Sequence, residues 1–140
     1  MKIILASHGY LADEMLSVLR SILGDDDEDD VESFCLDTYD DPSALSEAIK
    51  KSIDQDSSSH FILVCDIKGG DVFNHLLPLC EIPGVSLVSG MNLDLVLSLV
   101  NIQPETEADF EEVIGEGRAG IQCFNMDTLE KMQDEDKDPF

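Results

Sequence analysis

Three short, mostly apolar runs, each followed by a loop that contains glycine and then by a helical pattern, constrain the fold of this chain most strongly. A strand that carries apolar residues on both faces must be covered on both faces, which is typical of a parallel sheet between two layers of helices. The chain is therefore expected to be an α/β protein, a three-layer α/β/α sandwich with a mainly parallel sheet. The three runs are Ile3-Ile4-Leu5-Ala6, Phe61-Ile62-Leu63-Val64-Cys65 and Val85-Ser86-Leu87-Val88-Ser89.

Apolar spacing and chain-breaking residues place the other elements around these strands. Between the strand runs, apolar residues recur every three to four positions, and glycine, proline or serine interrupts most of the repeats. The predicted domain covers residues 1–125, and residues 126–140 are expected to be a polar tail with one helical turn. The predicted strands are 2–6, 31–36, 60–66, 85–89 and 119–124, and the predicted helices are 11–23, one between 41 and 57, 71–77, 92–100 and 106–116.

The charge of the chain excludes two classes of partner. Its net charge is −23, from 31 acidic and 8 basic residues. Nucleic acid and anionic membranes are bound through lysine and arginine, so neither is an expected partner. The charge fits a protein that meets more basic protein surfaces, or one that is adapted to high salt. Six consecutive acids, 25–30, cannot pack into a core and therefore predict a solvated loop. The alternative, a cation site, is disfavoured because these acids lack the alternating ligands of a calcium loop.

The apolar runs are too short for a membrane protein. None approaches the roughly 20 residues that span a bilayer. Met1-Lys2 leads directly into the first apolar run, without a basic-then-apolar leader. The chain is therefore expected to be a cytoplasmic protein without membrane insertion.

The four cysteines, Cys35, Cys65, Cys80 and Cys123, form no C-x-x-C pair, and each lies in or beside an apolar run. Reduced, buried thiols fit this pattern better than disulfides or a zinc site. The cysteines therefore predict no metal site.

Polar residues gather in the loops that follow three of the predicted strands, 7–9, 66–71 and 89–92. In an open parallel sheet, ligands bind at the carboxyl ends of the strands. His8 and Asp66 lie in two of these loops, and a carboxylate that binds one imidazole nitrogen leaves the other free as a nucleophile or a base. Spacing alone leaves open whether His8 has this role or is a structural residue at a strand end.

Other side chains near these loops are weaker candidates. His60 begins a strand after a serine-rich loop, and His75 lies within a predicted helix. Cys65 is adjacent to Asp66, but side chains alternate along a strand, so Cys65 is expected to point into the core. The turn Gly69-Gly70 precedes a helix whose free N–H groups favour an anion.

Four segments, in order along the chain, resemble the mannose-family enzyme IIA of the bacterial sugar phosphotransferase system (PTS). The first contains the strand-to-helix histidine, the second an aspartate and a double glycine, the third a strand followed by Gly-Met-Asn-Leu, and the fourth a Gly-Arg-x-Gly strand. Together they cover nearly the whole chain. They are ILASHGYLADEMLSVLRSILG (4–24), FILVCDIKGGDVFN (61–74), VSLVSGMNLDLVLSLV (85–100) and GRAGIQCF (117–124).

The resemblance implies a phosphotransferase that acts as a phosphoryl relay. His8 would accept a phosphoryl group from the phosphocarrier protein HPr and pass it to enzyme IIB, which phosphorylates the sugar during uptake. Asp66 would orient the imidazole and leave Nε2 as the attacking atom. Because phosphoryl transfer asks mainly for positioning and charge stabilisation, no cofactor or metal is expected. The predicted phosphoryl-binding residues are Gly9, Gly69, Gly70 and Asp71.

The same resemblance implies a homodimer. In the family the last strand, here 119–124, is exchanged and pairs antiparallel at the edge of the partner's sheet. Association with the membrane would be indirect, through the permease components. The resemblance does not name the sugar, because the IIA protein of this family does not contact it.

Two residues depart from the family pattern. Asp71 replaces the serine of Gly-Gly-Ser-Pro, and it is expected to cap the helix that follows. The other reading of Asp71 is that its charge repels the phosphoryl group and destabilises phosphorylated His8. Asp94 replaces a proline, which leaves the detailed shape of its loop open.

Three other functions stay open at this point. The phosphotransfer subunit of dihydroxyacetone kinase shares the fold and the early histidine, although its sequence is expected to depart from Gly-Met-Asn-Leu. A regulatory domain would use phosphorylation of the histidine to control a partner. A non-catalytic binding module would result if Asp71 had abolished the activity of the site.

Overall fold

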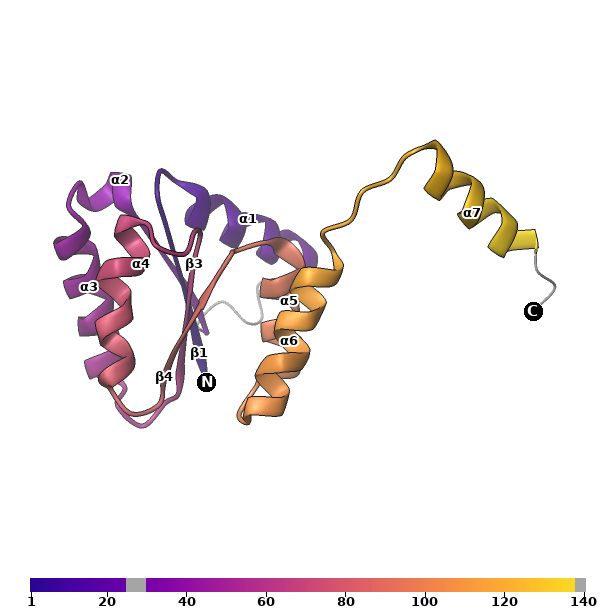
Figure 1. The fold of residues 1–140 in the computed structure, drawn as a ribbon. Helices are drawn as coiled ribbons and strands as arrows, with labels where there is room; N and C mark the ends of the chain where they lie inside the picture. Colours follow the sequence, from indigo (N-terminus) through magenta and orange to yellow (C-terminus); the bar gives the residue numbers. More distant parts are fainter. Residues whose placement is uncertain (25–29, 138–140) are drawn as a thin grey trace.

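The computed structural model describes residues 1–24 and 30–137 and has the three-layer α/β/α architecture that the sequence predicts. Parallel strands form one sheet in the order β2-β1-β3-β4, with helices on both faces (Figure 1). β1 and β3 are central because each pairs with a neighbour on both sides. The strands are β1 Lys2–Ser7, β2 Val31–Cys35, β3 Phe61–Cys65 and β4 Val85–Ser89.

The helices begin and end largely where the sequence provides caps. They are α1 Leu11–Leu23, α2 Leu36–Tyr39, α3 Pro42–Gln55, α4 Asp71–Leu76 with the 3-10 helix η1 Leu77–Glu81, α5 Leu93–Ile102, α6 Glu107–Ala119 and α7 Met126–Lys137. Gly24 ends α1 with a φ of 82°, which glycine adopts readily. The Asp41 side chain accepts a hydrogen bond from the Ser43 N–H and opens α3, and Thr106 and Asp109 form a capping box at α6. In the described ranges, no helix is long and apolar enough to cross a membrane.

Side chains of the central strand β1 alternate between two separate hydrophobic cores. Ile3 and Leu5 pack with residues of α1, α5 and α6, whereas Ile4 and Ala6 pack with residues of α3 and α4. These four side chains are at most 2% exposed. The uninterrupted apolar run in the sequence therefore reflects burial on both faces, and this burial stabilises the sheet between its two helical layers.

One strand boundary differs from the prediction, and one predicted helix end is confirmed. Leu36, expected as the last residue of a strand, begins α2, because β2 has reached the end of its pairing with β1 at Ser7 and Cys35. The expectation that Pro78 kinks or ends the helix that starts at 71 is confirmed: α4 ends at Leu76, and Pro78 lies in the first turn of η1. At that position its missing N–H removes no hydrogen bond.

The C-terminal segment differs most from the prediction. The predicted strand 119–124 is not formed within the single chain: α6 continues to Ala119, and 121–125 has no ladder partner among the described residues. Residues 126–137 form α7 and not a single helical turn, and Figure 1 shows α7 standing away from the sheet. The predicted acidic loop 25–30 lies outside the described residues except for Asp30.

The prediction of four buried thiols is wrong for two cysteines. All four are free, but only Cys35 and Cys65 are buried, whereas Cys80 and Cys123 are exposed. Cys80 lies on η1, and Cys123 lies in the segment that follows α6. The apolar neighbours of Cys123 in the sequence predicted burial, but in the single chain that segment has no core to pack against.

The central strand β3 provides a direct test of this packing. Leu63 is fully buried, so Leu63→Ala removes buried methyl groups and leaves a cavity between the sheet and the α3–α4 layer. We expect the free energy of unfolding in urea to fall by about 2–5 kcal/mol. Leu77→Ala is the matched control, because Leu77 is 49% exposed on η1, and its loss should stay within about 0.5 kcal/mol. Equal losses in the two variants would contradict the assigned core.

Candidate functional site

The pairing of the central strands brings His8 and Asp66 together. β1 and β3 are parallel neighbours with Ala6 opposite Cys65, so the loops that follow both strands begin at the same edge of the sheet. The His8 Nδ1 lies 2.9 Å from the Asp66 Oδ2, and the His8 backbone N–H donates to the same oxygen at 2.9 Å. The Asp66 Oδ1 accepts a hydrogen bond from the Ile67 N–H at 3.0 Å. Backbone donors thus hold the carboxylate in place beneath the imidazole.

This arrangement leaves one nitrogen of His8 open. An ionised carboxylate only accepts hydrogen bonds, so Asp66 keeps a proton on Nδ1 and Nε2 carries the lone pair. Among the described residues, Nε2 has no hydrogen-bond partner, and 41% of the His8 side chain is exposed against 14% for Asp66. The pair can therefore present a nucleophilic nitrogen, or a base, to a ligand from solvent.

Three glycines shape the loops around the imidazole. A Cβ at Gly70 would lie 3.0 Å from the His8 Cε1 and 3.0 Å from the Ile67 Cγ2, so the absence of a side chain makes room for the ring. Gly9 and Gly69 have φ angles of 53° and 83°, in the left-handed region that favours glycine. The Gly69 carbonyl also accepts a hydrogen bond of 3.2 Å from the Asn74 side chain, which ties this turn to α4.

The expected capping role of Asp71 is wrong. Gly70 occupies the N-cap position of α4, with φ −76° and ψ 175°, and no side chain caps the helix. Asp71 is the first helical residue, one position too late to cap, and its side chain is exposed. Its carboxylate therefore adds negative charge near the turn Gly69-Gly70 and satisfies none of the free N–H groups there.

The other candidate residues lie outside this site. His60 directly precedes β3 and therefore lies at the amino ends of the strands, at the opposite end from His8. The His75 Nδ1 lies 2.8 Å from the Asp71 carbonyl within α4. Cys65 is fully buried, and burial together with the charge of Asp66 raises the pKa of its thiol to about 11. Cys65 is protonated at neutral pH, and the expectation that it is a core thiol is confirmed.

The third predicted loop, 89–92, has a structural role in the chain. The Asn92 side chain caps α5 by accepting a hydrogen bond of 2.9 Å from the Leu95 N–H, and it donates to the Gly117 carbonyl at 3.3 Å. The carboxylate of Asp94 lies where a Cβ of Gly120 would be. The start of α5 is thus held against the end of α6, an arrangement that spacing along the sequence does not reveal.

Comparison with known proteins assigns the family. Residues 2–115 match the family model EIIA-man, described as the PTS system fructose IIA component. The chain belongs to the EIIA-man family. The resemblance inferred from the sequence is thereby confirmed, and this EIIA-man protein is a PTS phosphotransfer component.

Solved structures share the fold of this EIIA-man protein. A protein from Klebsiella pneumoniae, assigned as a phosphoenolpyruvate-dependent sugar PTS permease, is 26% identical with a TM-score of 0.78, and the match covers 91% of this chain and 93% of that one. EIIA from Streptococcus agalactiae is 24% identical (TM-score 0.73, coverage 88% and 96%). The mannose/sorbose IIA subunit from Enterococcus faecalis is 21% identical (TM-score 0.72, coverage 89% and 95%). No curated protein matches the chain.

Exposed apolar side chains border the histidine of this EIIA-man protein. Tyr10 and Leu11 follow His8 in the chain and are 56% and 45% exposed, and Ile67 is 58% exposed on the Asp66 loop. Apolar side chains left in solvent beside a reactive group are typical of a surface that binds a protein. Sequence reasoning did not single out these residues, because their exposure depends on the fold.

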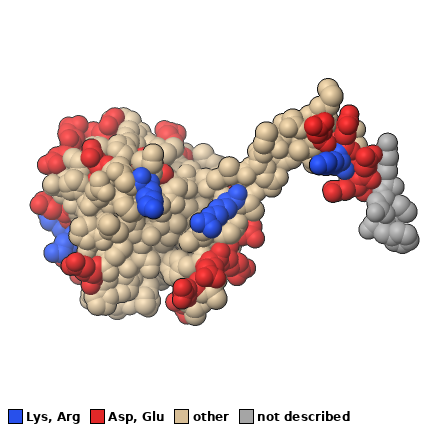
Figure 2. All heavy atoms as spheres, viewed as in Figure 1, with Lys and Arg blue, Asp and Glu red and all other residues tan. Residues whose placement is uncertain are grey.

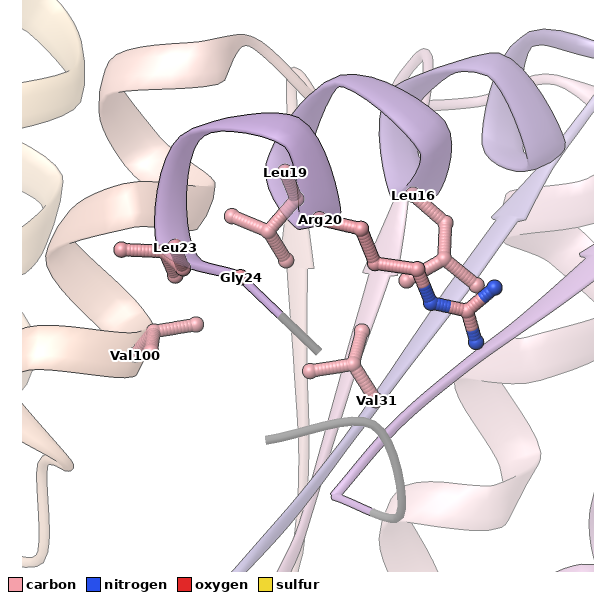
Figure 3. Close-up of a pocket in the computed structure, with 7 residues that line it drawn as sticks. All are labelled: Leu16, Leu19, Arg20, Leu23, Gly24, Val31 and Val100. Atoms are coloured by element: carbon pink, nitrogen blue, oxygen red, sulfur yellow. The ribbon is translucent and has the colours of Figure 1, made fainter. Parts of the chain in front are cut away.

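Away from His8, the described residues contain a small cavity but no candidate metal site. Among residues 1–24 and 30–137 no group of three His, Cys, Asp or Glu side chains is placed to hold a metal ion. A small cavity lies where α1, β2 and α5 meet, lined by Leu16, Leu19 and Val100, with the Arg20 guanidinium alongside (Figure 3). It adjoins Val31 at the amino end of β2, whereas His8 follows the carboxyl end of β1.

Gly70→Ala tests the role of the space beneath the imidazole. The backbone angles of Gly70 suit alanine, but its Cβ would press on the His8 ring. We expect the fold to be retained and the His8–Asp66 hydrogen bond to be disturbed, with the rate at which the protein is phosphorylated in a PTS assay reduced about 10- to 100-fold. The measurements are the chemical shifts of the His8 ring nitrogens and the phosphorylation rate.

Gly115→Ala is the matched control, because a Cβ at Gly115 of α6 meets nothing within 4 Å. This variant should keep the wild-type phosphorylation rate. Normal His8 shifts and a normal rate in Gly70→Ala would show that the contact does not position the ring.

Proposed function

We propose that this EIIA-man protein is the cytoplasmic phosphoryl carrier of a sugar PTS, which accepts a phosphoryl group on His8 from HPr and passes it to enzyme IIB during sugar uptake. One observation carries the proposal: Asp66 binds the Nδ1 of His8 at 2.9 Å while Nε2 is open to solvent. The family assignment supports the same reaction class.

The transfer step follows from this geometry. The lone pair of the His8 Nε2 attacks the phosphorus of the phosphohistidine on HPr as the donor P–N bond breaks, and the electron pair of that bond returns to the donor imidazole. The Nδ1 proton stays in the hydrogen bond to Asp66, whose charge balances the positive charge that the His8 ring gains. Transfer to enzyme IIB repeats the step with His8 as the donor.

The loops on either side of the imidazole are the proposed phosphoryl-binding region. It comprises Gly9, Gly69, Gly70 and Asp71, in which backbone N–H groups would approach the phosphoryl oxygens. These N–H groups and Asp66 provide positioning and charge balance, which phosphoryl transfer chiefly requires, so the proposed relay uses no cofactor or metal. Tyr10, Leu11 and Ile67 would contact HPr and enzyme IIB around the reacting nitrogen.

We also propose that the protein forms a homodimer by exchange of the segment 119–124. β4 is an edge strand, and a cleft of about 340 Å³ beside it is lined by Leu87, Ser89, Ile114 and Ile121. Ile121 and Phe124 are 76% and 64% exposed in the single chain. Beyond Ile121 the segment that follows α6 leads away from the sheet of its own chain (Figure 1), and this leaves it available for exchange with a second copy. The proposed domain is 1–125, with 126–140 as an appended segment.

Phosphorylation of His8 is tested by incubating the protein with phosphoenolpyruvate, enzyme I and HPr and following the label. We expect the wild type to be labelled and His8→Ala to remain unlabelled. His75→Ala is the control and should be labelled normally, because the His75 ring bonds to the Asp71 carbonyl of its own helix and lies outside the site. An unlabelled wild type would favour a non-catalytic module, and a labelled His8→Ala would place the phosphoryl group elsewhere.

Asp71→Ser tests whether the extra charge destabilises the phosphorylated state. Because Asp71 does not cap α4, its exposed carboxylate adds a charge without a compensating hydrogen bond next to the turn at which the phosphoryl group is proposed to bind. Replacing it with serine should lengthen the half-life of phosphorylated His8 by about 1.5- to 5-fold, the range of a surface charge interaction. Asp71→Asn separates loss of the charge from gain of a hydroxyl donor. An unchanged half-life in both variants would show that the charge is screened.

A further inference from the structure

α7 presents an apolar face that its own chain does not cover. Met126, Leu129 and Met132 recur at helical spacing and are 76%, 54% and 46% exposed. The start of the helix is fixed by Asn125 and Thr128, since the Asn125 side chain accepts from the Thr128 N–H and the Thr128 hydroxyl accepts from the Asn125 N–H. An isolated helix of this length is marginal in water, so it requires a surface to pack against.

The length of the segment 121–125 determines where α7 would lie on a second copy after strand exchange. Ile121 lines the cleft beside Ser89 and Gly90, so the segment leaves α6 at the carboxyl end of the edge strand. In the exchange proposed above the segment pairs antiparallel with the β4 of a second copy, the direction that the family resemblance implies. Residues 121–125 and 85–89 have the same length, about 17 Å. Pairing them brings Met126 to the amino end of the β4 that is being paired.

A second hollow lies at that end of β4. It measures about 130 Å³ and lies between β3, β4 and the loop before α6, with Val85, Ser86, Pro104, Glu105 and Phe110 in its lining. Phe110 and Ser86 are half-buried, and Val85 and Pro104 are buried. The lining is therefore mixed: Val85, Pro104 and Phe110 offer apolar contacts at the position that the first turn of α7 would reach, beside the polar Ser86 and Glu105.

We propose that α7 of one chain packs the face formed by Met126, Leu129 and Met132 into the hollow at Val85 and Phe110 of a second copy. The inference rests on the exchanged dimer proposed above and extends it from one strand to a strand and a helix. A five-residue strand alone makes a small interface, whereas stable interfaces bury about 1,200–2,000 Å² in total. The helix would supply the additional apolar contact.

The charges of the two surfaces predict the effect of salt on this contact. α7 carries Asp127, Glu130 and Asp134, and the amino-terminal half of α6 beside the hollow carries Glu107 and Glu111. Figure 2 shows acidic side chains over both helices. Docking brings charges of the same sign together, so dimerisation should be tighter at 1 M salt than at 0.1 M, where the Debye length falls from about 10 Å to about 3 Å.

The test combines sedimentation with cross-linking by a short bismaleimide. In a full-length chain with Cys80→Ser and Cys123→Ser, which removes the exposed thiols, the pair Leu129→Cys and Glu105→Cys places one thiol on the apolar face and one at the rim of the hollow. The matched control replaces Leu129→Cys with Asp127→Cys, which lies on the opposite side of α7 and only two residues from Leu129 along the helix. A chain with Leu129→Cys alone reports contact between two α7 helices.

The proposal expects a dimer in sedimentation and a covalent dimer that forms at least about tenfold faster in the Leu129–Glu105 pair than in the control. A dimer with equal rates in the two pairs, or equally fast cross-linking through Leu129→Cys alone, would overturn the docking of α7 and leave strand exchange intact. A monomer at all concentrations and at both salt concentrations would overturn the exchange and the docking together. Labelling of His8 is measured separately and depends on neither outcome.

Discussion

The parallel pairing of β1 with β3 is the constraint on which the candidate site depends. With Ala6 opposite Cys65, the chain reaches His8 and Asp66 at the same edge of the sheet, 58 residues apart in sequence but 2.9 Å apart in space. A shift of one residue in this register would turn every side chain of one strand to the other face of the sheet. Burial on both faces of these strands makes such a shift costly, so the hydrophobic core fixes the geometry of the polar pair above it.

The elements that the sequence predicts well are those defined by local pattern and burial. The apolar runs at 3–6 and 61–65 became central strands because only a doubly covered sheet can bury them. Caps such as Asp41 located helix starts, since a side-chain oxygen there meets a free N–H two residues on. The juxtaposition of His8 and Asp66 followed from a general property of parallel sheets, namely that the carboxyl ends of neighbouring strands lie at the same end of the sheet.

The features that the sequence did not predict depend on neighbours distant in the chain or on a second chain. Aspartate is a residue type that often caps helices, yet at α4 the N-cap position is occupied by Gly70, which packs against the His8 ring. This long-range contact is not visible in the local sequence. Residues 119–124 have the pattern of a strand, but a strand exists only when it pairs, and the single chain leaves the segment unpaired. Exposure of Tyr10, Leu11 and Ile67 likewise became visible only when the site was assembled.

The edge strand connects the proposed dimer to the proposed chemistry. The Met91 N–H donates to the Cys65 carbonyl at 3.1 Å, so the loop after β4 is held directly beside the strand end that carries Asp66. The cleft lined by Ser89, Gly90 and Ile121 begins at that loop. A second chain paired with β4 would therefore stand next to the His8 loops and limit the directions from which a partner approaches Nε2. In the isolated chain one side of β4 has no neighbouring strand among the described residues. Once a second chain pairs with that side of β4, it would complete one side of the proposed phosphoryl site.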